Sequence, residues 1–325
     1  MDDSQLRIGY VPEHFSTPLH FAQEHFGLNA QLIPFPSGTG HMITAIRSGE
    51  IDVGIGLTEA WVAGLGKEEK PGDAGYHIVG TYVETPLCWA ISTGSNRPDI
   101  SSVESLKGKK IGISRPGSGS QVMGYVLADQ QGWLSSSSTS SPFSEFVPLQ
   151  TFEKLRRAVN DGTADFFMWE HFTSKRYHDA GDIQRVGEIY TPWPSWQIVA
   201  SSALLRGGEK GRPYPRLMDV FKKLDQGVRH FETHEEEVVQ YIAQNLDYSA
   251  EDAREWIRTV RFSAKTEGVD VDVVTKCIDI LKKAGVLDHK DANGKERDTK
   301  WMADEMLVQG LAAQFPEEDP LVKAD

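Results

Sequence analysis

The stretch IGISRPGSGSQVMGYVLADQQGW, residues 111–133, decides the fold of this chain. It joins a short apolar strand, Ile111–Ser114, to a helix through a loop rich in glycine and serine. Apolar residues at three- and four-residue spacing indicate the helix, and Ser118 is a favourable N-cap. Small residues at a helix start let an anion approach the free backbone N–H groups. The stretch predicts an α/β unit whose helix either binds an anion or is merely capped by this loop.

The same loop lacks the common nucleotide-binding and nucleophile motifs. It matches neither the phosphate-binding pattern G-x-x-x-x-G-K-[ST] nor the dinucleotide pattern G-x-G-x-x-G. The nucleophile elbow G-x-S-x-G of the α/β-hydrolases is also missing. The sequence therefore gives no indication of nucleotide binding or of serine-hydrolase chemistry.

A second pattern, A-x-x-x-G-x-x-D, occurs twice. It reads AIRSGEID in residues 45–52 and AVNDGTAD in residues 158–165. In each copy we expect a helix to end, the glycine to form its C-cap and the aspartate to enter the next strand. Apolar strands at Leu6–Tyr10 and Lys110–Ser114 precede the two copies in the same order. The repetition predicts two related α/β lobes that face one another.

Composition limits the possible partners and compartment. The chain has 325 residues, a net charge of −13 and no basic patch, which argues against nucleic acid as a partner. No apolar run is long enough to span a membrane. The acidic N-terminus lacks signal-peptide features, and Cys88 and Cys277 are the two cysteines. We expect a cytoplasmic protein; the sequence does not indicate its oligomeric state.

The order of the predicted elements gives the domain organisation. Residues 1–84 and 197–325 form the expected first lobe, and residues 85–196 form the second. Two hinge crossings are expected, at residues 84–87 and 191–197, the second stiffened by Pro192 and Pro194. From Tyr214 onward, helical spacing predicts a helical C-terminal segment with helices at Leu217–Phe231, Glu235–Asn245, Ala250–Thr259, Val271–Ala284 and Trp301–Ala312.

Two lobes, two crossings and a helical end resemble the type II periplasmic-binding-protein fold over nearly the whole chain. The segment SLKGKKIGISRPGSGS, residues 105–120, and the repeated A-x-x-x-G-x-x-D pattern are similar to the sulfonate, nitrate and thiamine-pyrimidine solute-binding group. The chain most resembles its fungal, signal-less Ca3427-like relatives. The resemblance implies a ligand held between two lobes that close over it by a hinge.

One branch of this group is enzymatic, the thiamine-pyrimidine synthases, which use iron, pyridoxal phosphate and a histidine of their own. Cys88 and Cys277 are too far apart in sequence to form the cysteine cluster of that branch. No lysine stands beside the first-lobe loops to hold pyridoxal phosphate as a Schiff base. His14 or His41 corresponds either to the donor histidine or, as we expect, to an ordinary loop residue. We therefore expect no cofactor.

The expected ligand site is the cleft where the strand ends of the two lobes meet. Helix starts and Arg115 favour an anionic group, whereas the glutamates favour an amine or a heterocyclic N–H. Tryptophans there could hold a flat ring, although Trp193 and Trp196 are equally suited to hinge packing. The predicted ligand-binding residues are Glu13, His14, Ser37, Gly38, Thr39, Thr58, Glu59, Trp61, Ser114, Arg115, Ser118, Gly119, Ser120, Trp169, Glu170 and His171.

Neither a metal site nor a catalytic set is predicted. His14, His41 and His171 with nearby glutamates offer suitable metal ligands, but they have no short-range ligand spacing. Ser118 with His171 and Glu170 does not make a credible triad, because adjacent histidine and glutamate rarely orient each other. We expect a non-catalytic binder or sensor of a small polar, anionic or heterocyclic metabolite. The alternative is an enzyme of thiamine-pyrimidine or related cofactor biosynthesis.

Overall fold

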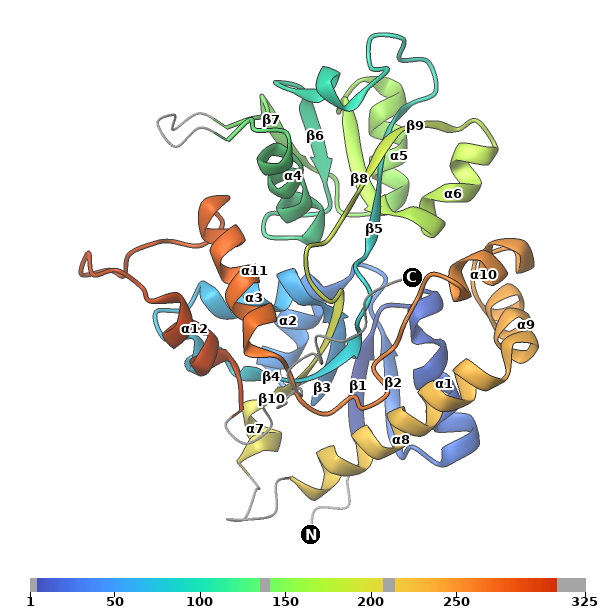
Figure 1. Cartoon of the computed structure of the whole chain (residues 1–325), viewed down its shortest axis with the longest axis vertical. Helices are drawn as coiled ribbons and strands as arrows, with labels where there is room; N and C mark the ends of the chain where they lie inside the picture. Colours follow the sequence, from blue (N-terminus) through green and yellow to red (C-terminus); the bar gives the residue numbers. More distant parts are fainter. Residues whose placement is uncertain (1–4, 135–140, 207–213, 309–325) are drawn as a thin grey trace, which may run out of the picture.

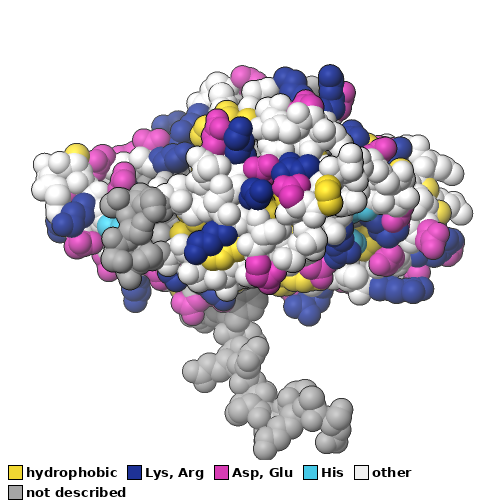
Figure 2. Space-filling model, turned by 90° about the horizontal axis from the view of Figure 1, so that it is seen from above, with side chains coloured by type: hydrophobic (Ala, Val, Ile, Leu, Met, Phe, Trp, Pro, Cys, Tyr) yellow, Lys and Arg dark blue, Asp and Glu magenta, His cyan; other side chains and the backbone are white. Residues whose placement is uncertain are grey.

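The computed structural model describes residues 5–134, 141–206 and 214–308. The described chain forms two α/β lobes, stacked along the long axis of the molecule and joined by two extended crossings (Figure 1). Each lobe contains a five-stranded mixed sheet with helices packed on it. Acidic and basic side chains are interspersed over the face shown in Figure 2.

The first sheet has the strand order β2-β1-β3-β10-β4. Strand β10 runs antiparallel to both of its neighbours, whereas β1 is parallel to β2 and β3. Its strands are β1 (Leu6–Tyr10), β2 (Ala30–Pro34), β3 (Val53–Leu57), β4 (Tyr76–Val83) and β10 (Trp196–Ser201). The helices between them are η1 (His14–Ser16), α1 (Thr17–Phe26), α2 (Thr39–Ser48), α3 (Thr58–Gly66) and η2 (Pro71–Asp73).

The second sheet repeats this arrangement with the order β7-β6-β8-β5-β9. Here β5 is the antiparallel strand, and it enters the sheet from the first crossing as β10 enters from the second. The strands are β5 (Cys88–Gly94), β6 (Lys110–Ile113), β7 (Glu145–Pro148), β8 (Phe166–Glu170) and β9 (Ile183–Tyr190). Its helices are η3 (Val103–Leu106), α4 (Gly119–Gln130), α5 (Phe152–Asp161) and α6 (His171–Asp179).

The repeated A-x-x-x-G-x-x-D pattern makes the same junction in both lobes. Gly49 and Gly162 end α2 and α5 in the left-handed region, with φ of 78° and 82°. The aspartate three residues after each glycine accepts a backbone N–H near the start of a neighbouring strand. Asp52 Oδ2 accepts the backbone N–H of Arg7, and Asp165 Oδ2 accepts that of Lys110, at 2.9 and 2.8 Å. The duplicated sequence pattern therefore corresponds to a duplicated structure.

The strand orders show which helices of the two lobes are equivalent, and they differ from the expectation in one place. By sequence, Ser37–Gly40 resembles Ser118–Ser120, since small residues open a helix in both, and the two are expected to be equivalent helix starts. In the structure α4 follows β6, the counterpart of β1, so its equivalent in the first lobe is α1. Helix α2 instead corresponds to α5. The two helix starts still face the same space, but they come from different positions in the repeat.

The C-terminal segment packs on the first sheet. Helix α8 lies along α1, and a Cβ added to Gly227 would lie 2.2 Å from the carbonyl oxygen of Pro18, so glycine is required there. Helix α11 packs against α3 on another side. The segment consists of α7 (Ser202–Leu205), α8 (Pro215–Thr233), α9 (Glu235–Asn245), α10 (Ala250–Ile257), α11 (Val271–Lys283) and α12 (Thr299–Met306).

Three α-helices, α3, α6 and the four-residue α7, were not predicted, and one predicted helix ends earlier than expected. The segments 58–66 and 171–179 follow buried strands directly and form α3 and α6. The predicted helix Trp301–Ala312 corresponds to α12, which begins at Thr299 and ends at Met306, because the backbone of Leu307 is extended. Residues 309–312 of that prediction lie outside the described part of the chain. Among the described helices, none combines the length and apolar character needed to cross a bilayer.

Candidate functional site

The space between the lobes contains a cavity of about 60 Å³. Because one water molecule needs roughly 10–15 Å³ of such space, the cavity has room for a few heavy atoms. Predicted residues from both lobes line it: Glu13, Ser37, Gly38 and Thr39 from the first, and Ser114, Arg115, Ser118, Gly119, Ser120, Trp169 and Glu170 from the second. Further lining residues were not predicted: Val11, Pro36, Gly40, Leu57, Ala60, Leu87, Trp89 and Trp196.

Two helix N-termini border the cavity. Helix α2 begins at Thr39 after Gly38, whose φ of 77° requires glycine. Helix α4 begins after Ser118, which has the extended backbone of an N-cap but makes no capping hydrogen bond. Its hydroxyl instead bonds Ser120 Oγ at 2.9 Å, and Ser120 Oγ accepts the N–H of Ser114 at 3.1 Å. The positive ends of both helix dipoles are therefore available to a bound anion.

Arg115 extends from the second lobe across the start of α2. A Cβ added to Gly40 would lie 3.1 Å from both Cδ and Nε of Arg115, so the arginine side chain packs on the glycine backbone. Its Nε is buried and has no hydrogen-bond partner among the described residues. Partial burial lowers the pKa of Arg115 from its usual value, although an arginine stays charged. A positive group with an unused donor is thus held at the cleft.

Two tryptophans add donors to the site: Trp89, which was not predicted, and Trp196, which was left between ligand contact and hinge packing. Trp89 and Trp196 are buried, and within the described chain neither indole Nε1 has a hydrogen-bond partner. They occupy equivalent places: Trp196 on β10 pairs with Leu57 at the end of β3, and Trp89 on β5 pairs with Glu170 at the end of β8. Because buried indole N–H groups normally find an acceptor, both are suited to meet one on a ligand.

The carboxyl groups of the cleft are shifted toward their neutral form. Removal from water raises the pKa of Glu13 to about 8, with a smaller contribution from the nearby Glu170 carboxylate. Burial also raises the pKa of Glu170 to about 7, although its Oε2 accepts bonds from the N–H and hydroxyl of Thr173 at 2.6 and 2.9 Å. A protonated carboxyl donates a hydrogen bond, so these residues are compatible with an anion near neutral pH.

Thr58 and Glu59 do not line the cleft, and that expectation is corrected. They form the first turn of α3 and hold the return crossing. The Thr58 hydroxyl donates to the carbonyl oxygen of Pro194, and its backbone N–H to that of Ser195. Glu59 Oε2 accepts the indole N–H of Trp193 at 3.1 Å. Both residues therefore fix the hinge, with Glu59 Oε1 directed toward Gly119 of the second lobe.

Trp61 was also expected to bind the ligand, but its side chain belongs to the core of the first lobe. The side chain is fully buried and packs on Gly54 of β3, where an added Cβ would lie 2.9 Å from the indole ring. Its ring meets that of Tyr76 edge-on at 5.4 Å. A tryptophan on the inner face of α3 covers the sheet, so it does not reach the cleft.

The two predicted histidines also lie outside the cavity. His14 is buried among aromatic rings, with ring centroids 4.1 Å from Trp256 and 4.4 Å from Tyr248, and burial lowers its pKa well below the usual range. Its Nε2 lies 3.8 Å from Glu170 Oε1. His171 lines a separate cavity of about 190 Å³ behind the hinge, next to Cys88 and Trp256. Neither side chain is therefore positioned as a direct ligand contact.

Fold and cleft together define a protein of the periplasmic-binding-protein class. Similar proteins of known family and structure support this assignment. A family model described as Ca3427-like PBP matches residues 89–189. The structure of the Candida albicans CA3427 gene product, which defines a family with the generic periplasmic-binding-protein fold, is 38% identical. The match covers 97% of this chain and 99% of that chain, with a TM-score of 0.81. The chain belongs to the Ca3427-like family.

More distant structures share the fold. The alkanesulfonate-binding protein SsuA from Xanthomonas axonopodis pv. citri, bound to MOPS, is 17% identical, with a TM-score of 0.70 over 94% of this chain and 98% of that one. The nitrate-binding protein NrtA from Synechocystis PCC 6803 is 13% identical, with a TM-score of 0.65 over 93% of this chain and 85% of that one. No curated protein sequence gives a significant match.

Proposed function

We propose that this protein binds a small anionic metabolite, of the sulfonate, carboxylate or phosphate kind, in the cleft between its lobes. The observation that carries the proposal is a set of buried donors in the cleft, Arg115 Nε, Trp89 Nε1 and Trp196 Nε1, which have no acceptor among the described residues. A small anion would accept bonds from these donors and lie against the starts of α2 and α4. The sulfonate and nitrate ligands named for the distant relatives support the same class.

The shape of the cleft narrows the class of ligand. The enclosed space suits a compact anionic head, while Leu57, Leu87 and the aromatic rings of Trp89 and Trp169 supply apolar walls. A ligand with a short apolar or planar tail would place its tail against these walls and its charged end at the helix starts. Heterocyclic metabolites with an acidic group meet the same requirement.

The alternative function, an enzyme of thiamine-pyrimidine or related cofactor biosynthesis, has weaker support. Among the described residues that line the cleft there is neither a lysine nor a histidine. The cleft itself therefore supplies no amine for a Schiff base with pyridoxal phosphate and no imidazole for iron. Binding without chemistry is the function we propose, and Cys88 and Cys277 as free thiols support an intracellular role.

Isothermal titration of purified protein with methanesulfonate, MOPS, nitrate, sulfate and phosphate tests the proposal. We expect at least one of them to bind with one site per chain. Arg115→Ala should weaken that binding roughly 10- to 100-fold, the effect of losing a charged hydrogen bond. Arg229→Ala removes an exposed arginine of α8 and is the matched control, which should leave the affinity unchanged.

Two results would contradict this proposal. One is equal affinity for the anion in the Arg115→Ala variant and the wild-type protein. The other is native mass spectrometry that finds stoichiometric iron or pyridoxal phosphate in freshly purified protein, which would favour the enzyme instead. Trp89→Phe and Trp196→Phe, which keep the ring but remove the N–H, show whether the indole donors contribute.

A further inference from the structure

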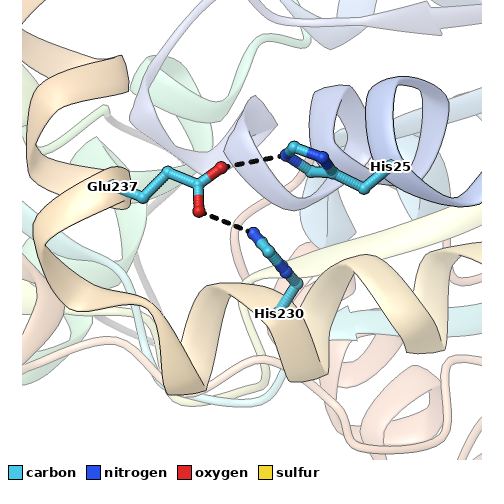
Figure 3. A group of neighbouring side chains, drawn as sticks. All are labelled: His25, His230 and Glu237. Atoms are coloured by element: carbon cyan, nitrogen blue, oxygen red, sulfur yellow. Dashed lines mark hydrogen bonds and ion pairs between the residues drawn. The ribbon is translucent and has the colours of Figure 1, made fainter.

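A cluster of metal-ligating side chains lies far from the cleft, where the C-terminal helices meet α1. Figure 3 shows the carboxylate of Glu237 between the imidazoles of His25 and His230. The two Nε2 atoms each lie 2.9 Å from a different oxygen of that carboxylate. The three residues come from three helices, α1, α8 and α9, and their ligand atoms all lie within 4.8 Å of one another.

We propose that His25, His230 and Glu237 form a binding site for a divalent transition-metal ion, with Zn²⁺ as the best match. Two imidazole nitrogens and one carboxylate oxygen are ligands that zinc accepts, and water would complete the coordination. Donor atoms around a tetrahedral zinc ion lie about 3.4 Å apart, since each bond is close to 2.0–2.1 Å. The present 2.9 Å separations therefore need to widen by only a few tenths of an ångström.

The surroundings hold the imidazole of His230 in place. His230 meets Phe21 and Phe26 edge-on, with centroids 5.1 and 5.8 Å away. Its other face stacks on His234 at 3.9 Å, and His234 Nδ1 is fixed by the carbonyl oxygen of His230 at 3.0 Å. Ligands that are already oriented lose little freedom when a metal binds.

Access to this position is open. The side chains of His25 and Glu237 are 31% and 40% exposed, so an ion can reach them and they can shift to accommodate it. A second cluster, Cys88, His171 and Glu188, also has suitable ligands. There, however, Glu188 already pairs with Arg185 and accepts a bond from Tyr190. Within the described part of the chain, the carboxylate of Glu237 has only the two imidazoles as polar partners.

A bound ion would connect the C-terminal helices to the first lobe. Helix α1 follows directly on η1 and the loop that carries Glu13, while α8 and α9 begin the C-terminal segment. An ion held by all three helices would bind the folded state and not the unfolded one, so it would raise the thermal stability. This site does not rest on the proposed anion binding.

Titration of chelator-treated full-length protein with Zn²⁺ at pH 7.5 tests the inference. We expect one equivalent to bind and the melting temperature to rise. Weaker binding is expected at pH 5.5, because imidazoles must be unprotonated to bind metal. His25→Ala, His230→Ala and Glu237→Gln should each lower the affinity at least about tenfold. His289→Ala, which removes an exposed histidine elsewhere, is the control and should bind like the wild-type protein.

Loading with Co²⁺ gives a readout that does not depend on stability. Coordinated Co²⁺ should show visible absorption bands that are lost in His25→Ala. The inference is overturned if Zn²⁺ binds His25→Ala and His230→Ala as tightly as the wild-type protein, or if no Zn²⁺ binds. It is also overturned if Cys88→Ser abolishes the stoichiometric binding, which would place the ion at the other cluster.

Discussion

Trp193 in the return crossing donates its indole N–H to Glu59 at the start of α3, with 3.1 Å between Nε1 and Oε2. The other carboxylate oxygen, Oε1, is buried with no partner in the described chain, and it lies beside Gly119 at the start of α4. A single side chain thus contacts the first lobe, a hinge crossing and the second lobe. We therefore expect its protonation state to affect the stability of the protein.

Glu59→Gln should stabilise the protein at high pH and have little effect at low pH. Burial raises the pKa of Glu59 to about 7, above the ordinary value of a glutamate. A carboxyl whose pKa is raised on folding contributes stability that is present in acid and is lost as pH rises from the ordinary value of about 4.5 to about 7, where the loss is complete. Relative to the wild-type protein, the variant should therefore gain roughly 2–3 kcal/mol in free energy of unfolding between pH 5 and pH 8.

Urea denaturation of both proteins at the two pH values measures this difference, because other titrating groups cancel in the comparison. Glu50→Gln changes an exposed glutamate of the same lobe and is the control. A stability difference between Glu59→Gln and wild type that does not vary with pH would show that the buried carboxyl does not titrate as described.

Affinity for an anion should fall as pH rises from 6.5 to 8.5. The pKa values of Glu13 and Glu170 are raised to about 8 and about 7, so both carboxyls lose their protons in this range. Protonated carboxyls can donate to an anion, whereas ionised ones repel it. Titration with methanesulfonate, which stays ionised throughout, should show a loss on the order of tenfold.

Glu13→Gln provides the matched comparison for this pH dependence. The amide keeps the size of the side chain and cannot ionise, so the variant should lose affinity less steeply than the wild-type protein above pH 7. Affinity that rises with pH would contradict the assignment of these carboxyls as neutral donors in the cleft.

Gly119→Ala should prevent the lobes from closing. An added Cβ would lie 2.7 Å from Glu59 Oε1, 3.1 Å from Leu57 Cδ1 and 3.2 Å from the Trp89 ring. Two of these contacts belong to the first lobe, so the methyl group pushes the lobes apart. We expect a larger radius of gyration in small-angle X-ray scattering and at least about tenfold weaker anion binding, on the basis of 1–3 kcal/mol for overpacking.

A double variant distinguishes this effect from simple misfolding. Glu59→Ala removes the closest contact, so adding it to Gly119→Ala should restore part of the compactness. If the double variant is as expanded as Gly119→Ala, the separation of the lobes does not arise from this contact.

Regular elements with a clear period were the most predictable part of this chain. Strand Leu6–Tyr10 and helix Glu235–Asn245 have the predicted bounds. In the helix, the spacing of apolar residues reports one buried face. Helix α3 was missed for the opposite reason. Its sequence TEAWVAGLG is buried on nearly all sides, so it shows no polar face from which a helical period can be recognised.

The cleft was predictable where small residues mark a helix start, as at Ser37–Thr39 and Ser118–Ser120. Trp89 was missed, and Trp196 was left between ligand contact and hinge packing, because a strand sequence does not show which of its side chains faces the other lobe. Their position in the sequence is a usable signal for a cleft residue. Each tryptophan is the first or second residue of the strand that follows a crossing. Glu59 was misplaced because local sequence does not reveal that the return crossing passes α3.

Gly227→Ala separates helix propensity from tertiary packing. Alanine is favoured over glycine in a helix interior by about 1 kcal/mol, so propensity alone predicts a more stable protein. In this structure a Cβ at Gly227 would lie 2.2 Å from the carbonyl oxygen of Pro18 and 3.0 Å from the backbone nitrogen of Ala22. Neither backbone atom can move without shifting α1, so α8 and α1 must separate.

We therefore expect Gly227→Ala to lose roughly 1–3 kcal/mol in free energy of unfolding, as overpacked sites do. Urea denaturation measures the loss, with Lys222→Ala at an exposed position of α8 as a control that should stay within about 0.5 kcal/mol. A more stable Gly227→Ala variant would mean that α8 does not approach α1 this closely. Because η1 and Glu13 immediately precede α1, a displaced α1 should also weaken anion binding in the cleft.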